Sequence, residues 1–313
     1  MTGIIYRNLL KPILFTQDPE SVHDRFTQIG SLLGKSQLTR HITSALFGYQ
    51  NKMLESTVCG VKFSNPVGLS AGFDKDAKLV SIMGSVGFGF TELGTVTFSP
   101  YGGNPKPRLY RLPKSKALVV YYGLKNEGAV RVIGRIKSSY HEDIVLGASI
   151  GKTNSKKTVS LDDGIKDYVA CLREFEKSGV AEYYTINISC PNTFGGEPYT
   201  TPLRLKALLH EIRKIKTSRP IFIKMPINLP WGEFKKLVEV AVRYKIDALV
   251  IGNLNKDHKS MTIKDEIPKH IKGGISGRPT WRLSNELISR TYQEFGDKIK
   301  IIGVGGIFSA EDD

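Results

Sequence analysis

The segment 186–192, with the sequence INISCPN, places a thiol between two carboxamides. The apolar, β-branched residues that lead into it predict a buried strand. Pro191 cannot continue a central strand, so the chain must turn where Cys190 emerges. A thiolate there could abstract a proton beside a carbonyl, while Asn187 and Asn192 hold a polar planar substrate. The other interpretation is a small buried cysteine beside two asparagines that form a turn, and this segment alone favours neither.

Elements of alternating type must position this segment. From residue 67 onward, short apolar runs alternate with longer amphipathic segments, which is typical of a parallel α/β fold. Strands are expected at residues 67–70, 90–93, 144–150, 184–189, 221–224, 248–251 and 301–304, and helices at 161–178, 202–216 and 231–244. Strand after strand ends in glycine or a polar residue. Functional groups at the carboxyl ends of parallel strands are the signature of a (β/α)8 TIM barrel, so the expected fold class is α/β.

An eighth strand is not visible in the sequence. The last residues, 308–313, have the composition of a helix start. A barrel of seven strands would leave two open edges, which is costly. We therefore expect the sequence to be truncated before its last strand, with residues 51–313 forming the barrel.

Residues 1–50 are expected to form an amphipathic helical extension. Asp18 and Pro19 occupy the cap and first-turn positions of a helix, and apolar residues then recur at helical spacing up to Leu33. A second amphipathic stretch runs from Leu38 to Phe47. These two helices could pack on the barrel, lie in a membrane interface, or frame a tunnel for an apolar molecule.

Composition narrows the classes of function. The three cysteines among 313 residues lack metal-ligand spacing, so no metal site is expected, and they indicate a reducing compartment such as the cytoplasm. No apolar run approaches the ~20 residues that cross a bilayer, and the N-terminus lacks the apolar centre of a signal peptide. The net charge of +15 suits a nucleic acid, an anionic membrane surface or an anionic ligand. Its clusters at Lys152, Lys156 and Lys157 and along residues 256–272 have loop-like composition, so we interpret them as solvated loops.

Six motifs in order carry a family resemblance. They are NPVGLSAGFDK (65–75), GTVT (94–97), KPRLYRL (106–112), NISCPN (187–192), GGISGRP (273–279) and GVGG (303–306). With them the chain resembles the dihydroorotate dehydrogenases, FMN-containing barrel enzymes of pyrimidine synthesis, and specifically the membrane-associated class that uses a quinone. The resemblance covers nearly the whole chain and implies the oxidation of dihydroorotate to orotate.

The resemblance implies FMN as the cofactor, held by the strand ends. Ala71 and Gly72 leave room for a flat ring beside the backbone. Lys224, at the end of an apolar strand, would stabilise negative charge on a reduced flavin. Gly277 and Gly306 can offer backbone amides to a phosphate. The implied FMN residues are Ala71, Gly72, Lys75, Thr95, Ser149, Asn187, Lys224, Gly252, Gly277 and Gly306.

The same resemblance implies a substrate pocket around the dihydroorotate ring. Lys75, Asn187, Asn192 and Asn253 would bind the ring, and Cys190 stands where the family places its base. In the quinone class that base is usually a serine. A thiol with an ordinary pKa near ~8.5 supplies more base at neutral pH than a hydroxyl does, so the exchange need not impair catalysis.

Three positions depart from the family pattern. An asparagine is usual before the third-loop glycine, whereas residues 118–123 read LVVYYG. Ser149 replaces an asparagine that contacts the flavin, and Leu254 replaces a threonine that often follows the asparagine of the sixth strand. A lost hydrogen bond to a charged ligand costs roughly 1.5–3 kcal/mol. These changes therefore bear on the identity of the substrate more than on the flavin.

On the quinone side, His23 and Arg111 match residues that the quinone class places near its quinone tunnel. The class implies peripheral contact with the cytoplasmic side of the cell membrane. Dihydroorotate and a quinone are the partners expected, and a nucleic acid is not.

Two other functions stay open at this stage. Another FMN barrel, such as a tRNA dihydrouridine synthase, would suit the basic charge, but those enzymes need an appended RNA-binding domain and none follows the barrel in this sequence. A degenerate flavoprotein that binds FMN without turnover would account for the altered third loop and the missing strand.

Overall fold

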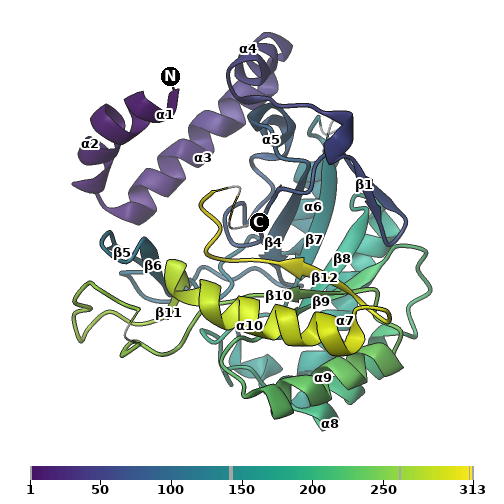
Figure 1. Cartoon of the computed structure of the whole chain (residues 1–313). Coiled ribbons are helices and arrows are strands. Elements are labelled where there is room, and N and C mark those ends of the chain that lie inside the picture. The colour runs from purple at the N-terminus through teal and green to yellow at the C-terminus, as the bar shows by residue number, and fades with distance from the viewer. Residues whose placement is uncertain (1, 141–143, 261, 310, 312–313) are drawn as a thin grey trace.

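The centre of the fold is a curled sheet of seven parallel strands, in the order β12-β10-β9-β8-β7-β4-β3 (Figure 1). The computed structural model describes residues 2–140, 144–260, 262–309 and 311. The strands are β3 (Gly68–Leu69), β4 (Phe90–Val96), β7 (Val145–Ile150), β8 (Tyr183–Asn187), β9 (Ile221–Met225), β10 (Ala248–Ile251) and β12 (Lys300–Gly303). All seven predicted strands are confirmed. Within the described ranges no strand joins β12 to β3. The helix start expected at residues 308–313 falls partly on Ala310, Asp312 and Asp313, which lie outside those ranges.

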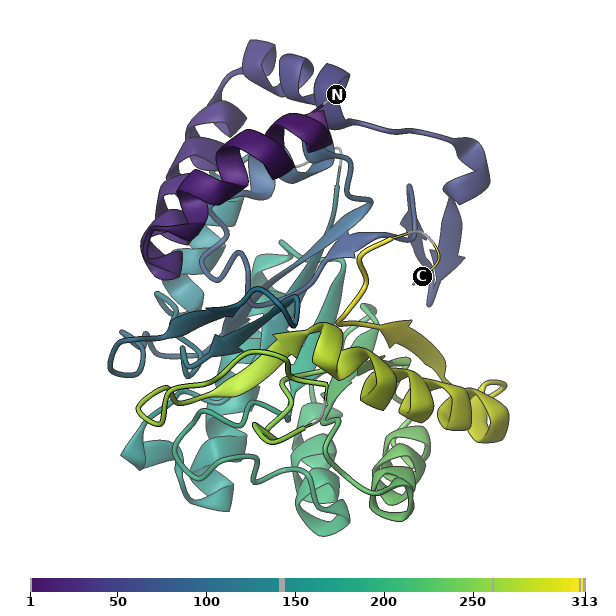
Figure 2. The same ribbon diagram turned by 60° about the vertical axis from the view of Figure 1, so that its left-hand side comes forward.

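Helices cover the outer face of this sheet (Figures 1 and 2). They are α5 (Val80–Val86), α6 (Ala129–Lys137), α7 (Leu161–Ser178), α8 (Pro202–Ile212), α9 (Trp231–Arg243) and α10 (Arg278–Phe295). The prediction for α7 is confirmed at both ends, because Ser160 caps its first turn and Gly179, with φ of 70°, ends it. The predicted helix 202–216 ends earlier, at Ile212.

The inside of the sheet is closed at one end by apolar side chains. A hairpin of β1 (Ser56–Val58) and β2 (Val61–Phe63) brings Phe63 against Phe90 and Tyr183, and Tyr183 stacks on Phe222. A side chain at Gly147 would collide with the ring of Tyr183, so glycine is required there. Phe90 and Tyr183 begin their strands and Phe222 is second in its strand. These apolar rings thus lie at the amino-terminal ends of the strands, and polar residues occupy the carboxyl ends of the same strands.

A second sheet was not predicted. It is antiparallel, in the order β11-β6-β5, and is built from β5 (Leu109–Leu112), β6 (Ala117–Val120) and β11 (Gly274–Gly277). Its strands have four residues each, and Ile275 pairs with Val119 from a distant part of the chain. Sequence patterning missed it because such short strands gain their stability from partners that local periodicity does not reveal.

The N-terminal region is helical from residue 2 to residue 47. The elements are α1 (Thr2–Ile5), the π-helix η1 (Tyr6–Leu10), α2 (Lys11–Phe15), α3 (Pro19–Lys35) and α4 (Gln37–Phe47). Both predicted helices are confirmed, and the Asp18 carboxylate accepts a hydrogen bond of 2.8 Å from the backbone N–H of Ser21 as a cap should. The helical segment before Asp18 was not predicted. In Figures 1 and 2, α2 and α3 lie on the same side of the molecule as β5 and β6.

A buried carboxylate ties α3 to the loops of the barrel. Glu20 is 3% exposed. Its oxygens lie 3.2 Å from Arg108, 3.5 Å from Lys125 and 4.0 Å from Lys106. Close by, Arg111 donates a 2.6 Å hydrogen bond to the carbonyl of Gln17. Three cations from the barrel side thus converge on one anion of the helix.

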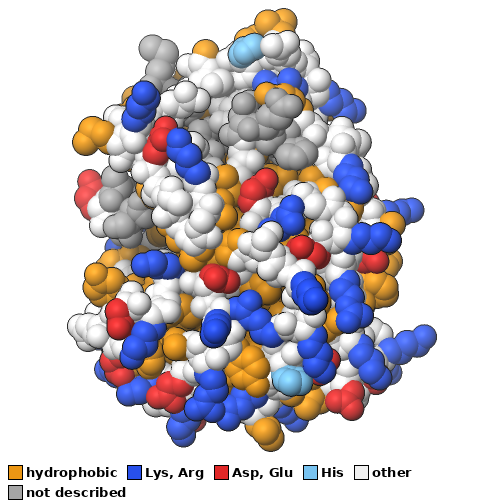
Figure 3. Space-filling view, turned by 90° about the vertical axis from the view of Figure 1, so that its right-hand side faces the viewer, with side chains coloured by type: hydrophobic (Ala, Val, Ile, Leu, Met, Phe, Trp, Pro, Cys, Tyr) orange, Lys and Arg blue, Asp and Glu red, His pale blue; other side chains and the backbone are white. Residues whose placement is uncertain are grey.

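The surface mixes both signs of charge. On the face seen in Figure 3, lysine and arginine side chains are abundant and acidic side chains lie among them. No helix in the described ranges combines the length and apolarity that crossing a membrane requires.

Glu20→Ala should loosen the attachment of α3, because it removes a charge-assisted hydrogen bond at a buried position. We expect the free energy of unfolding to fall by about 1.5–3 kcal/mol in urea titrations, with faster proteolysis within α3. Glu55→Ala is the matched control, since Glu55 pairs with Lys62 at an exposed site and should cost less than about 1 kcal/mol. Equal effects of the two variants would contradict the role of Glu20.

Candidate active site

A cavity opens at the carboxyl ends of the strands, and most of the predicted site residues meet there. Its lining includes nine of them: Ala71, Gly72, Lys75, Thr95, Asn187, Cys190, Asn192, Lys224 and Asn253. These residues come from five strand ends that are far apart in sequence. The parallel pairing brings them together, because it places the ends of neighbouring strands at one edge.

One side of the cavity is a chain of buried hydrogen bonds across three strands. The Asn187 side-chain amide donates to Thr95 Oγ1 at 2.8 Å, and Thr95 Oγ1 lies 2.9 Å from Ser149 Oγ. Either hydroxyl can donate in the Thr95–Ser149 pair, because the Thr95 oxygen keeps a second lone pair after it accepts from Asn187. Ser149 is fully buried and does not line the cavity itself. It supports the wall through Thr95.

The opposite side is fixed by Ser189. Asn253 donates a hydrogen bond of 2.6 Å to Ser189 Oγ, which in turn donates to the backbone carbonyl of Lys224 at 2.9 Å. Ser189 also donates its backbone N–H to Asn187 Oδ1 at 3.2 Å. Two of the three asparagines predicted to bind substrate, Asn187 and Asn253, are therefore held in place by Ser189, which is the support that a precise site needs.

Lys224 supplies a buried positive charge beside the cavity. It is 7% exposed, and among the described residues no carboxylate oxygen lies within 4.0 Å of its ammonium. Burial lowers its pKa, while Glu92 and Cys190 raise it. Glu92 lies deeper in the sheet and accepts a 2.7 Å hydrogen bond from Thr185. A cation of this kind favours negative charge on whatever occupies the cavity.

Cys190 is half-buried at the edge of the cavity. Burial raises the pKa of its thiol to about 11, against the lowering effects of the Asn192 backbone N–H, Lys224 and Lys152. The sequence predicts an ordinary pKa for this thiol. The structure corrects that prediction, because desolvation disfavours the thiolate. A base at this position depends on the cations around it.

The segment around Val120 is tied to Asn192 through its backbone. The Asn192 side chain donates a hydrogen bond of 2.8 Å to the carbonyl of Val120. Asn104 donates to the carbonyl of Asn192 at 3.0 Å. Val120 and Leu254 both line the cavity, so two of its surfaces are apolar.

Sequence reasoning missed a set of buried polar residues around this loop. They are Asn104, Asn126, Lys152 and Asn154, each no more than 6% exposed. The interpretation of Lys152 as part of a solvated loop is wrong, whereas Lys156 and Lys157 are exposed as predicted. One sequence feature could have revealed that Lys152 and Asn154 are buried: residues 152–154 come directly after the end of a predicted strand.

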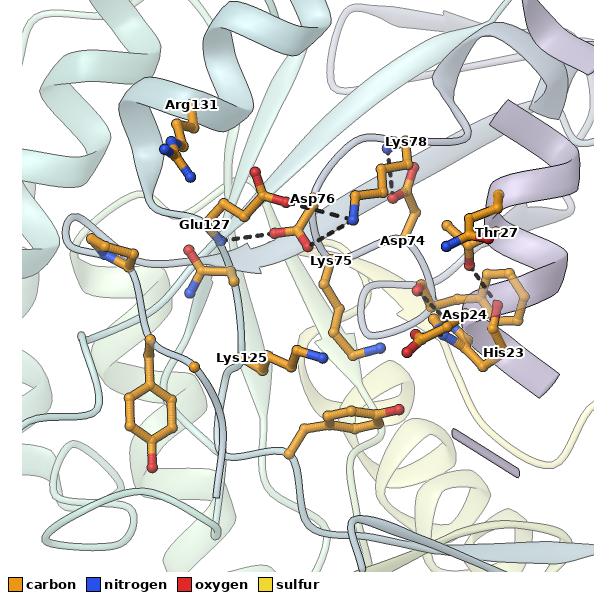
Figure 4. A pocket seen from close by; sticks show the side chains of 17 residues that line it. His23, Asp24, Thr27, Asp74, Lys75, Asp76, Lys78, Lys125, Glu127 and Arg131 are labelled. Carbon is orange, nitrogen blue, oxygen red and sulfur yellow. Dashed lines mark hydrogen bonds and ion pairs between the residues drawn. The ribbon is translucent and has the colours of Figure 1, made fainter. Parts of the chain in front are cut away.

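A second cavity, of about 400 Å³, lies between α3 and the barrel loops. Figure 4 shows Lys75 and Lys125 extending toward each other from different loops, with His23 and Asp24 projecting from α3. Lys75 lines both cavities. Burial lowers its pKa to about 8, and Lys125 contributes to that shift. The lining of this cavity is charged, unlike that of a tunnel for an apolar molecule, which was one of three roles considered for these helices.

The two residues predicted on the quinone side occupy different places. His23 lines the second cavity, and its Nε2 lies 2.9 Å from the carbonyl oxygen of Phe73. Arg111 is outside the lining of that cavity, and its guanidinium lies 4.8 Å from the ring of Phe15.

The remaining predicted residues form a glycine-rich patch. Gly277 precedes α10, and a side chain at Gly306 would meet the carbonyl of Gly277 at 3.3 Å, so these two glycines are neighbours. Gly252 follows β10 and packs on the backbone of Val304. The side chain of Trp281 lies beside Gly306, and its buried indole N–H has no hydrogen-bond partner among the described residues. A helix N-terminus with an unused donor suits an anion.

These features fit FMN. A side chain at Gly72 would meet no atom within 4 Å, so a planar ring can approach the backbone there. The hydroxyl of Tyr122, which lines both cavities, is buried and has no partner within the described part of the chain. Lys224 offers positive charge in the cavity lining, and the patch at Gly277 and Gly306, which lies outside that lining, offers backbone donors.

Comparison with known proteins gives consistent results. The family model described as dihydroorotate dehydrogenase matches residues 53–313. A dihydroorotate dehydrogenase (quinone) of Synechococcus sp. (strain JA-3-3Ab) is 34% identical over 98% of this chain and 83% of its own length. The protein of the same name from Nostoc punctiforme is 35% identical over 98% of this chain and 84% of its own. The solved structure of DHODH from Eimeria tenella in complex with ferulenol is 27% identical, with a TM-score of 0.81 over 94% of this chain and 82% of that one.

Thr95→Val should destabilise the protein, because it leaves Ser149 and the Asn187 amide without their shared partner. We expect a loss of about 1–3 kcal/mol in the free energy of unfolding, measured by urea titration. Thr91→Val, on the same strand, is the control. Its hydroxyl is buried without a partner, so the change should be neutral or stabilising. If Thr95→Val is as harmless as the control, the hydrogen-bond chain does not support the wall.

Proposed function

Because the chain belongs to the dihydroorotate dehydrogenase family, we propose how its own residues carry out the family's reaction. The protein oxidises dihydroorotate to orotate in pyrimidine synthesis and passes the electrons to a quinone. The observation that supports a working site is the convergence of Cys190, three asparagines and three lysines on one cavity. With the family assigned, no observation favours a tRNA substrate or a degenerate flavoprotein.

FMN is the cofactor we propose, held by the ten residues from Ala71 to Gly306 named above, of which Ser149 would act through Thr95. Bound FMN would supply the acceptor for the hydride that leaves ring carbon 6 of dihydroorotate. Lys224 would balance the negative charge that arrives with it. The patch at Gly277 and Gly306 would bind the phosphate through backbone N–H groups. Thr95 and Asn187 would contact the ring system from the wall of hydrogen bonds.

The substrate ring is bound by Asn187, Asn192 and Asn253, and its carboxylate by Lys75. Cys190, as thiolate, takes the proton from ring carbon 5 and becomes a thiol. Lys75 is charged below its pKa of about 8 and loses its proton above it. Binding of the carboxylate should therefore weaken as the pH rises through about 8, while the thiolate fraction of Cys190 increases as the pH rises through about 11.

Cys190→Ala should slow anaerobic flavin reduction by dihydroorotate by at least ~10²-fold, as is typical for loss of a general base. Stopped-flow absorbance measures the rate, and the FMN spectrum should persist because the thiol is not part of the phosphate patch. Cys190→Ser should retain some activity, mostly at high pH. The control is Cys59→Ala, a half-buried cysteine whose thiol donates to the carbonyl of Asp247. A near-normal rate in Cys190→Ala would exclude the thiol as base.

We propose further that residues 1–50 form the side that meets the membrane and the quinone, with residues 51–313 as the FMN-binding barrel. Exposed large apolar side chains gather in residues 4–47. On α4, Leu38, Ile42 and Leu46 are 69%, 51% and 59% exposed. Their spacing of four residues places them on one face of the helix. Such a face suits shallow insertion at the cytoplasmic side of the cell membrane, with His23 and Arg111 near the path of the quinone.

Replacing Leu38, Ile42 and Leu46 together by serine should reduce binding to phospholipid vesicles by at least about a hundredfold. Each such side chain contributes ~1.5–3 kcal/mol when it leaves water. Co-sedimentation measures binding, and turnover with a water-soluble quinone should be unchanged. Leu203→Ser, at a residue 78% exposed on α8, is the control. Unchanged vesicle binding in the triple variant would show that α4 does not insert.

A further inference from the structure

Lys152 is a buried cation that the proposed mechanism does not use. It follows β7 and is 3% exposed. Its ammonium donates to the carbonyl of Phe194 at 3.2 Å and to Thr158 Oγ1 at 3.3 Å. No carboxylate among the described residues lies within 4.0 Å of it. Burying a cation against neutral oxygens alone is costly, so its retention calls for a reason beyond packing.

The partner of Lys152 belongs to the loop that carries Cys190. Phe194 is held at both ends of its backbone unit: its carbonyl accepts from Lys152, and its N–H donates to Asn154 Oδ1 at 2.8 Å. The Asn154 amide in turn donates to the carbonyl of Gly123 at 3.0 Å. The turn after β7 thus fixes the loop that runs from Cys190 to Phe194.

The charged groups around Cys190 come from three directions. Lys152 and Lys224 favour its thiolate, and Glu197 disfavours it, although Glu197 is itself paired with Lys256. On the side of Lys152, the charged neighbour is Asp167 of α7, whose carboxylate already accepts hydrogen bonds from the backbone and the hydroxyl of Thr153. Lys224 also faces Glu92. Lys152 is therefore the cation near Cys190 that has neither a carboxylate partner nor a contact with the cavity.

We propose that Lys152 is a positioning residue for Cys190, which holds the Cys190 loop through Phe194 and favours the thiolate by its positive charge. The inference rests on the proposed role of Cys190 as base. The thiol loses its proton to solvent when the thiolate forms. The thiolate then forms its S–H bond with the proton from ring carbon 5, and Lys152 keeps its own protons throughout.

The test is the pH dependence of Cys190 alkylation by iodoacetamide in the holoenzyme, measured by mass spectrometry of the Cys190 peptide. Lys152→Gln keeps a donor for Phe194 but removes the charge. We expect the midpoint of its rate profile to move to higher pH. Below the midpoint, alkylation should slow about tenfold for each unit by which the thiol pKa rises. Lys152→Arg should restore the midpoint, and Lys157→Gln, at an exposed lysine of the same segment, should leave it unchanged.

An unchanged midpoint in Lys152→Gln would overturn the inference. Faster alkylation at that unchanged midpoint would show that Lys152 only anchors the loop and does not favour the thiolate. Should Lys152→Gln fail to fold, the failure of Lys152→Arg to match the wild-type midpoint would overturn it, and a matching midpoint would support it. None of these results tests whether Cys190 is the catalytic base. Cys190→Ala tests that role, so a failure of the role of Lys152 can be told apart from a failure of the role of Cys190.

Discussion

The arrangement of the molecule depends on the parallel register of its central sheet. Parallel neighbours end at the same edge, so Thr95, Asn187 and Lys224 meet although Thr95 and Asn187 are 92 residues apart in sequence. The apolar plug around Phe63 and Tyr183 fills the other end. A polar side chain is buried there at least cost where it can bond to a neighbour, and the chain from Asn187 through Thr95 to Ser149 meets that requirement.

Burial acts on both signs of charge in the site. Desolvation raises the pKa of Cys190 and lowers that of Lys75, Lys152 and Lys224, so each group by itself is driven toward its neutral form. Lys152 and Lys224, in contrast, stabilise the thiolate and are stabilised by it. A thiol base at such a desolvated position therefore needs cations near it. The fold provides Lys152 from the end of β7 and Lys224 from the end of β9.

The N-terminal helices combine two kinds of contact. Toward the barrel, α3 is attached by polar groups, with Glu20 among three cations and Arg111 on the carbonyl of Gln17. Toward solvent, α4 presents an apolar stripe. The cavity between α3 and the barrel is lined by charged side chains and shares Lys75 and Tyr122 with the cavity at the carboxyl ends of the strands. The two cavities therefore have in common the ammonium group of Lys75 and the hydroxyl of Tyr122.

The sequence alone determined the parallel strands, helix α7, the capped start of α3 and the residue types at the strand ends. Periods of 2 and 3.6 residues and cap residues are local signals, and each strand can be read without its neighbours. Only the tertiary structure decided that Lys152 is buried while Lys156 is exposed, that Val120 serves Asn192 through its backbone carbonyl, and that β11 pairs with β6. It also decided the direction in which the pKa of Cys190 shifts, because desolvation depends on every element packed around the thiol, and the cations that oppose it, Lys152 and Lys224, are distant in sequence.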